Sequence, residues 1–223
     1  LTIDIALVRQ LLQAQHPDLA ELPISLADEG WDNVMYRLGD TWVLRLPRRE
    51  VAAQLILNEQ QFLPQLAPLL PIPISAPVRT GQPQGAYPWH WSILPWFAGD
   101  TADVSLVASE QAVRFAQFLK CLHQPAPANA PPNPVRGVPL ADRQQPVERG
   151  MAELQGKTDL VSPLILELWQ QGLTAAIDTP KQWLHGDMHA RNVLVKNGEI
   201  AAIIDWGDIT AGDAATDIAA VWS

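Results

Sequence analysis

Residues 185–207 constrain the fold of this chain more than any other stretch, because they form a polar loop, a β-hairpin and a second polar loop. The first loop holds Asp187 and Asn192, and the second begins at Asp205. Between the loops, Asn197-Gly198 separates two short apolar runs, which is a strong signal for a type I′ hairpin. We therefore expect the hairpin to bring three oxygen-bearing side chains together at one end.

These three side chains are of the types that phosphoryl transfer requires. A carboxylate such as Asp187 can orient a hydroxyl group and accept its proton late in the transfer. The side-chain oxygens of Asn192 and Asp205 are hard ligands that suit magnesium. Because an apolar run precedes Asp205, we read that run as a buried strand that places the carboxylate at the floor of a cleft, beside Asn192.

The first half of the chain is typical of a small antiparallel sheet with helices. Helical spacing of apolar residues predicts helices over 3–15 and 50–66. Short apolar runs bounded by turn residues predict strands over 22–27, 34–38, 42–46 and 87–94.

The second half is mainly helical by the same criteria. Helices are predicted over 109–123, 147–155, 163–176 and 217–222, with the hairpin at 193–204. The proline-rich segment 125–139 cannot be a regular element and predicts a surface insertion or linker. This order indicates an α+β arrangement of two lobes, with a connector near residues 95–99 and a ligand cleft between the lobes.

Composition excludes several other classes of protein. The 223 residues include 24 acidic and 15 basic side chains, so a net charge of −9 argues against nucleic acid as a partner. No apolar run approaches the ~18 residues of a membrane span, and no secretory leader is present. The single cysteine, Cys121, excludes an internal disulfide. We expect a cytoplasmic protein without membrane contact.

The polar loops resemble those of a known enzyme family. His185-Gly186-Asp187 with Asn192 resembles the catalytic loop of protein kinases, and Asp205-Trp206-Gly207 resembles their Asp-Phe-Gly. The longer patterns Leu-His-Gly-Asp-x-His-x-x-Asn and Ile-Asp-Trp-Gly-Asp are more similar to the aminoglycoside phosphotransferase family. Residues 212–219 are similar to that family's Gly-Asp-x-x-x-Asp-Leu-Ala.

The resemblance implies a two-lobed, protein-kinase-like α+β fold. Residues 1–95 would be the nucleotide-binding lobe, with an antiparallel sheet and a helix. Residues 96–223 would be the catalytic lobe, mainly helical with a β-hairpin. Members of the family normally continue with further helices, so we expect this lobe to lack them.

The resemblance also implies roles for the polar loop residues. Asp187 would be the catalytic aspartate, and Asn192 and Asp205 would bind Mg²⁺. Asp217 would brace the loop from inside, and His185 would support the loop backbone. The implied activity is transfer of a phosphoryl group from ATP, or GTP, to a hydroxyl of a small molecule.

The acceptor is less well defined by the sequence. An acidic pocket would suit an amine-bearing acceptor such as an aminoglycoside or an aminoalcohol, and a sugar or homoserine-like acceptor stays open. Candidate acceptor-side residues are His189, Asp208, Asp213 and the predicted helix 163–176.

At the nucleotide end, the resemblance implies a cation on the third strand paired with an acid on the following helix. Arg45 and Glu59 occupy those positions, and the usual lysine is absent. An arginine can bind phosphate and carboxylate oxygens, but its planar fork is larger and more rigid than an ammonium group. Backbone N–H groups around Asn33 could contact phosphate. The connector offers a purine base the carbonyl of Pro95 and the N–H of Phe97, because proline has no N–H.

Other functions stay open at this point. His185, Asp187 and His189 could supply zinc ligands, although Asn192 would then be unexplained. The replacement of lysine by Arg45 also allows a kinase-like module that binds nucleotide with weak or no catalysis. A serine hydrolase has little support, because the chain has no Gly-x-Ser-x-Gly elbow.

Overall fold

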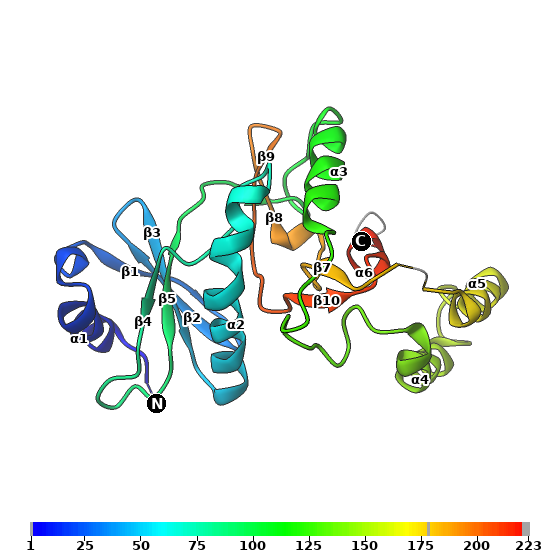
Figure 1. Cartoon of the computed structure of the whole chain (residues 1–223), viewed down its shortest axis with the longest axis horizontal. Helices are drawn as coiled ribbons and strands as arrows, with labels where there is room; N and C mark the ends of the chain where they lie inside the picture. Colours follow the sequence, from blue (N-terminus) through cyan, green and yellow to red (C-terminus); the bar gives the residue numbers. More distant parts are fainter. Residues whose placement is uncertain (1, 178, 220–223) are drawn as a thin grey trace.

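The computed structural model describes residues 2–177 and 179–219, which form two lobes side by side (Figure 1). The first lobe contains an antiparallel five-stranded sheet in the order β1-β2-β3-β5-β4. The second lobe contains the sheets β6-β8-β9 and β10-β7 together with most of the helices. The predicted α+β arrangement is therefore confirmed.

The elements of the first lobe follow the predicted order, with one addition. The strand β4 was not predicted, and β5 begins at Trp91 rather than at Tyr87, because Tyr87 exchanges turn hydrogen bonds with the backbone of Gln84. The elements are α1 (Ile5–Gln15), β1 (Ile24–Glu29), β2 (Asn33–Leu38), β3 (Trp42–Pro47), α2 (Glu50–Leu66), β4 (Arg79–Gly81) and β5 (Trp91–Pro95).

The alternation of side chains along β3 positions the first functional group. Leu44 and Leu46 are fully buried in the core between the sheet and α1. Because successive side chains of a strand point to opposite faces, Arg45 points to the other face, toward α2 and the second lobe. Arg45 pairs with Met35 on β2 and with Ser92 on β5. The strand β3 therefore has a neighbour on each side and is a central strand of the sheet.

The second lobe confirms the predicted hairpin and adds short strands. The strands β6, β7 and β10 have only two or three residues, which is too short for a periodic signal. The elements are β6 (Asp100–Thr101), α3 (Gln111–Leu122), α4 (Gln144–Leu154), α5 (Pro163–Thr174), β7 (Gln182–Leu184), β8 (Val193–Lys196), β9 (Glu199–Ile203), β10 (Thr210–Gly212) and α6 (Ala215–Ile218).

The last predicted helix, residues 217–222, is only partly described. The helix α6 covers Ala215–Ile218, and residues 220–222 lie outside the described residues. Short 3₁₀ helices lie at Pro17–Leu19, Ala67–Leu69, Leu140–Arg143 and Ala190–Asn192.

One hydrophobic cluster joins the two lobes. Phe62 and Leu63 of α2 belong to the same buried cluster as Phe118 of α3 and Trp206. Trp206 is fully buried, its ring lies 4.6 Å from the ring of His185, and its Nε1 donates to the carbonyl of Ile203 at 3.1 Å. This core holds the start of the second polar loop against the first, which begins at His185.

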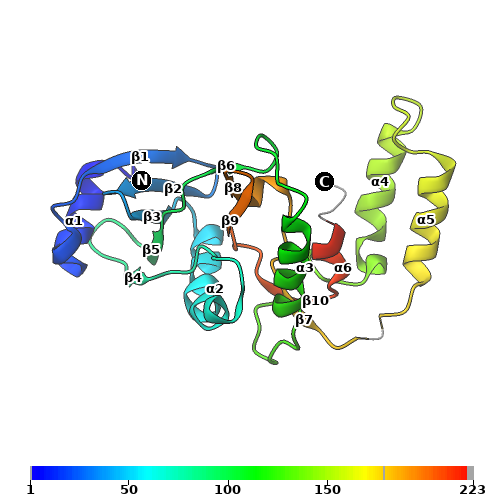
Figure 2. The same ribbon diagram turned by 90° about the horizontal axis from the view of Figure 1, so that it is seen from above.

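The helices α4 and α5 form a hairpin that projects from the second lobe (Figure 2). Neither helix contains a buried residue, and Leu164 and Leu168 of α5 are exposed. The apolar spacing thus predicted both helices. It did not predict that neither helix would contain a buried residue. Among the described residues, no helix has the length and apolar character that a membrane span requires.

Candidate active site

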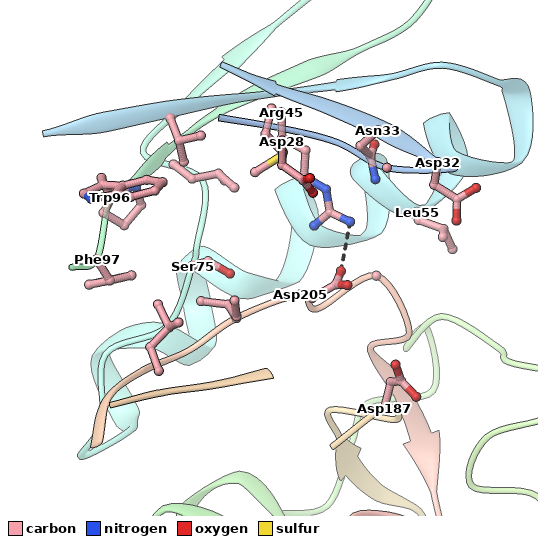
Figure 3. Close-up of a pocket in the computed structure, with 18 of the residues that line it drawn as sticks. Asp28, Asp32, Asn33, Arg45, Leu55, Ser75, Trp96, Phe97, Asp187 and Asp205 are labelled. Carbon is pink, nitrogen blue, oxygen red and sulfur yellow. Dashed lines mark hydrogen bonds and ion pairs between the residues drawn. The ribbon is translucent and has the colours of Figure 1, made fainter. Parts of the chain in front are cut away.

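A cleft of about 530 Å³ lies between the lobes (Figure 3). One wall comes from the sheet, the closed end from the connector after β5, and the floor from the polar loops that flank the β8–β9 hairpin. Its lining residues include Val43, Arg45, Pro95, Trp96, Phe97, Asp187, Leu194, Ile204, Asp205 and Asp208.

The predicted Arg45–Glu59 pair is present in the structure. Nη1 of Arg45 lies 3.0 Å from Oε1 of Glu59, and both side chains are buried. The other arm of the guanidinium donates to Oδ1 of Asp205 at 3.0 Å, across the cleft (Figure 3). With its amide oxygen turned toward the guanidinium, Asn33 accepts from Nη2 and Nε at 3.1 and 3.2 Å. A single cation therefore links the sheet, α2 and the second lobe.

Burial shifts the pKa values of Glu59 and Arg45. Removal from water raises the pKa of Glu59 to about 7, although Arg45 acts in the opposite direction. Burial also disfavours the charged form of Arg45, but the carboxylates of Glu59 and Asp205 outweigh it and raise the pKa of the guanidinium. The guanidinium therefore stays charged while two carboxylates share it.

Asp217 braces the first polar loop, at residues 185–186, from inside the lobe. Its Oδ2 accepts from the backbone N–H of His185 at 2.8 Å, and its Oδ1 accepts from that of Gly186 at 2.9 Å. The ring nitrogen Nε2 of His123 lies 3.1 Å from Oδ2. The carboxylate is fully buried. Its removal would leave two backbone donors unsatisfied.

His185 supports the same loop through both ring nitrogens. Nε2 lies 2.9 Å from the carbonyl of Ile204, and Nδ1 accepts from the N–H of Asp187 at 3.2 Å. Burial lowers the pKa of His185, which favours the neutral ring that this pattern needs. The predicted support of the loop backbone is thus visible in the geometry.

The zinc alternative gains no support from the described part of the chain, where no three His, Cys, Asp or Glu side chains gather as a metal-binding group. The physical reason lies in His185, because backbone groups occupy both of its nitrogens.

A tight approach of the two polar loops sets their geometry. Gly186 has φ 86°, and a Cβ atom there would lie 2.3 Å from the carbonyl oxygen of Asp208. Asp205 also adopts a left-handed conformation, with φ 57°. Asp is one of the residue types that tolerate this region. The turn ends the run from β9 and directs the Asp205 carboxylate into the cleft (Figure 3).

Asn192 contacts the residue before Asp205, although it does not line the cleft surface. Its carbonyl accepts from the N–H of Ile204 at 2.9 Å. Its side-chain Nδ2 donates to the carbonyl of Asp187 at 2.8 Å, and no donor among the described residues contacts its Oδ1. The amide oxygen of Asn192 and the carboxylate of Asp205 are each of the oxygen type that magnesium prefers.

Asp187 makes a contact that the sequence did not predict. Its Oδ1 accepts from Nη2 of Arg136 at 2.5 Å, and its Oδ2 lies 3.3 Å from Nε2 of His189. Arg136 also approaches Asp208, with Nε 3.5 Å from Oδ2. Arg136 is the only charged residue of the proline-rich segment 125–139. This single charge in an otherwise uncharged segment is the sequence signal that could have identified Arg136.

The predicted acceptor-side residues separate into two groups. Asp208 lines the cleft, and His189 contacts Asp187 while also lining a second, apolar cavity of about 320 Å³ beside α3. Asp213 does not line the cleft, because its carboxylate instead accepts from the N–H of Ala215 at 3.0 Å. The helix α5 contributes no lining residue, because the α4–α5 hairpin projects away.

The connector lines one end of the cleft. Pro95 and Phe97 lie there, together with the apolar side chains of Val43 and Leu194. The N–H of Trp96 donates to the carbonyl of Thr41 at 2.8 Å, so this donor is already engaged. The ring of Trp96 also stacks against Arg37, whose Cζ lies 4.2 Å from the ring centre.

Solved structures of similar fold are phosphotransferases. A GDP complex of a mutant aminoglycoside 2′-phosphotransferase-IIIa superimposes with a TM-score of 0.72 at 18% identity, over 98% of this chain and 76% of the other. The streptomycin–ATP ternary complex of APH(2″)-IIa gives 0.65 at 18%, over 99% and 76%. Macrolide 2′-phosphotransferase MphH from Brachybacterium faecium, as apoenzyme, gives 0.63 at 21%, over 95% and 74%. The fold is therefore that of the kinase-like phosphotransferases.

The sequence comparison identifies the family. The model of the phosphotransferase enzyme family (APH) matches residues 23–223, so the chain belongs to this family and is a phosphotransferase. A search of curated protein sequences found no match.

Proposed function

We propose that the chain transfers the terminal phosphoryl group of ATP or GTP to a hydroxyl of a small-molecule acceptor. The observation that carries this proposal is one cleft that has Asp187 and Asp205 on its floor and connector backbone at its closed end. Membership of a phosphotransferase family supports it.

The nucleotide would lie with its base at the connector and its phosphates toward Arg45. Pro95 and Phe97 offer a backbone acceptor and donor, and Val43 and Leu194 offer apolar walls to a planar base. Similar folds have been solved with GDP and with ATP. On this basis residues 1–95 form the nucleotide-binding lobe and residues 96–223 the catalytic lobe.

The charge of the cleft supports a requirement for magnesium. Five aspartates line the cleft, and Arg45 is the only Lys or Arg among its lining residues. A nucleotide polyphosphate would be repelled by these carboxylates in the absence of a divalent cation. The Oδ1 of Asn192 and the carboxylate of Asp205 are the proposed ligands. A divalent cation held there would supply positive charge to offset the phosphate oxygens.

The proposed chemical step places Asp187 beside the acceptor. The acceptor oxygen forms a bond to the terminal phosphorus, and the bond from that phosphorus to the bridging oxygen breaks. The nucleoside diphosphate leaves, and the hydroxyl proton passes to the carboxylate of Asp187. Arg45 and the backbone at Asn33 would hold phosphate oxygens during the step.

The acidic floor favours an acceptor that carries amines, such as an aminoglycoside or an aminoalcohol. Asp208 and Asp187 both line the floor, and Nε2 of His189 lies 3.3 Å from Oδ2 of Asp187. A cationic group near these carboxylates would be attracted electrostatically. A sugar or homoserine-like acceptor is the alternative that a screen would distinguish.

The test is nucleotide consumption against aminoglycosides, aminoalcohols, sugars and homoserine analogues, followed by Asp187→Ala. We expect the variant to lose transfer by about 10³-fold or more, while its affinity for magnesium nucleotide, measured by calorimetry, stays within about twofold of the wild type. Asp18→Ala in the first lobe is the control and should retain full activity. Transfer by Asp187→Ala at a near-normal rate would exclude Asp187 as the base.

A second candidate function is nucleotide binding without turnover. It is favoured by the contact of Arg45 with Asp205, which engages one oxygen of a proposed metal ligand. Tight binding of magnesium nucleotide, with no phosphorylation of any acceptor class, would support this function over transfer.

A further inference from the structure

Arg136 is the one charged residue of the proline-rich segment that runs between α3 and α4. Its guanidinium joins two acidic side chains of the cleft, with Nη2 at 2.5 Å from Oδ1 of Asp187 and Nε at 3.5 Å from Oδ2 of Asp208. The contact with Asp187 connects residues 51 positions apart in the sequence. The segment thus reaches the proposed catalytic carboxylate from outside the catalytic loop.

Asn133 fixes the approach of Arg136. Its Oδ1 accepts from the backbone N–H groups of Val135 and Arg136, both at 3.0 Å. Its Nδ2 donates to Oδ1 of Asp208 at 2.7 Å. The turn that carries the arginine is therefore tied to the same carboxylate that the arginine approaches.

Gly137 anchors the segment on its other side. Its N–H donates to the hydroxyl of Thr216 at 3.1 Å, and its carbonyl accepts from the N–H of Asp213 at 3.0 Å. A Cβ atom at Gly137 would lie 2.9 Å from Cα of Gly212, so the two backbones touch. Residues 133–137 are thus a fixed strap against β10 and α6, not a loose linker.

We propose that Arg136 is a positioning residue: it holds Asp187 by Oδ1 while His189 contacts Oδ2, and so fixes the orientation of the carboxylate toward the acceptor hydroxyl. The inference rests on the proposed transfer reaction. A carboxylate on an open cleft floor can rotate about its side-chain bonds, and a bidentate-capable guanidinium restricts that rotation. Since a displacement of about 1 Å can reduce a rate by about 10²-fold, this restraint acts on turnover.

The opposite function for the same contact is inhibition. If Arg136 blocked Asp187, an acceptor would have to displace it, and removing the guanidinium would raise turnover or lower the KM for the acceptor. The two functions therefore predict changes of opposite sign.

The test compares Arg136→Met with Arg79→Met, using an acceptor that the wild type phosphorylates. Arg79 is a matched control, because its side chain is 41% exposed against 38% for Arg136, and it pairs with Asp18 in the first lobe. We expect Arg136→Met to lower kcat by about 10- to 100-fold, with the KM for nucleotide within about twofold. Arg136→Lys should recover part of kcat, and Arg79→Met should match the wild type.

A double variant separates positioning from an independent effect. In the Asp187→Asn background, Arg136→Met should change the residual kcat by less than about twofold, because groups that act as a unit are not additive. An equal loss in both backgrounds would overturn the proposal, as would a kcat for Arg136→Met that is unchanged or raised.

A readout without turnover keeps the inference distinct from the proposed function. The guanidinium Nη–H signals of Arg136 in a ¹⁵N spectrum should be sharp in the wild type, because Nη2 contacts Asp187, and broadened or exchanged in Asp187→Ala. A signal that Asp187→Ala leaves unchanged would overturn the inference. A wild type that phosphorylates no acceptor would contradict the proposed function alone.

Discussion

Two arginines each lie between two carboxylates in or beside this cleft, and they differ in burial. The Arg45 side chain is 9% exposed and contacts Glu59 and Asp205, whereas that of Arg136 is 38% exposed and contacts Asp187 and Asp208. Away from water, charges interact strongly, and an unpaired partner is costly. Near water, the same contacts are screened. We infer that the Arg45 group is part of the folded framework, whereas the Arg136 group contributes little to stability and its restraint on Asp187 acts on turnover.

The largest expected loss of stability comes from removing the cation of the buried group formed by Arg45, Glu59 and Asp205. Arg45→Met leaves Glu59 buried without its cation, and we expect the free energy of unfolding to fall by about 3–5 kcal/mol at pH 8. Urea denaturation followed by tryptophan fluorescence would measure it. A loss below about 1 kcal/mol would show that the buried and exposed groups do not differ as inferred.

Titration of the buried group should change stability with pH. The folded pKa of Glu59, about 7, lies above its unfolded value, so the folded state holds an extra proton between these values. The free energy of unfolding of the wild type should therefore fall from about pH 4.5 to about pH 7, relative to Glu59→Gln, by roughly 1–3 kcal/mol. Urea denaturation at several pH values would test this. Parallel profiles for the two proteins would contradict the assigned environment of Glu59.

A conservative change should weaken the buried group without breaking it. Arg45→Lys keeps the positive charge, but an ammonium group cannot reach Glu59 and Asp205 with two separate arms. We expect a loss of about 1 kcal/mol in the free energy of unfolding. The same measurement on Arg136→Lys serves as the control and should show a smaller change.

The smallest expected effect on stability comes from the exposed group. Arg136→Met should lower the free energy of unfolding by less than about 1 kcal/mol, because solvent screens its ion pairs. Urea denaturation beside Arg45→Met would measure the contrast directly. A loss for Arg136→Met as large as that for Arg45→Met would remove the distinction between the two groups.

Local patterns predicted most of the regular elements. The helix over residues 50–66 has the predicted bounds, and the Asn197-Gly198 turn joins two paired strands. These signals depend on neighbours within a few positions, which is why they can be read without the fold. The short strands β6, β7 and β10 carried no such signal, because pairing with distant partners defines them.

The candidate site was predictable where a motif fixed the spacing. Asp187, Asn192 and Asp205 all lie at or beside the cleft floor, and Arg45 pairs with Glu59. The assignment of Asp213 to the acceptor side was not supported, because a local backbone contact takes its carboxylate. Asn133 and Arg136 were missed, since a proline-rich segment gives no periodic pattern that would place its side chains.

The sequence by itself determined the residue types of the cleft, the hairpin that joins its two polar loops and the family to which the chain belongs. The tertiary structure decided which charges share a partner. Arg45 and Asp205 are 160 positions apart, and Arg136 and Asp187 are 51 apart. Turn and helix signals arise from adjacent residues. These ion pairs exist only because packing of the core brings distant segments to the same cleft.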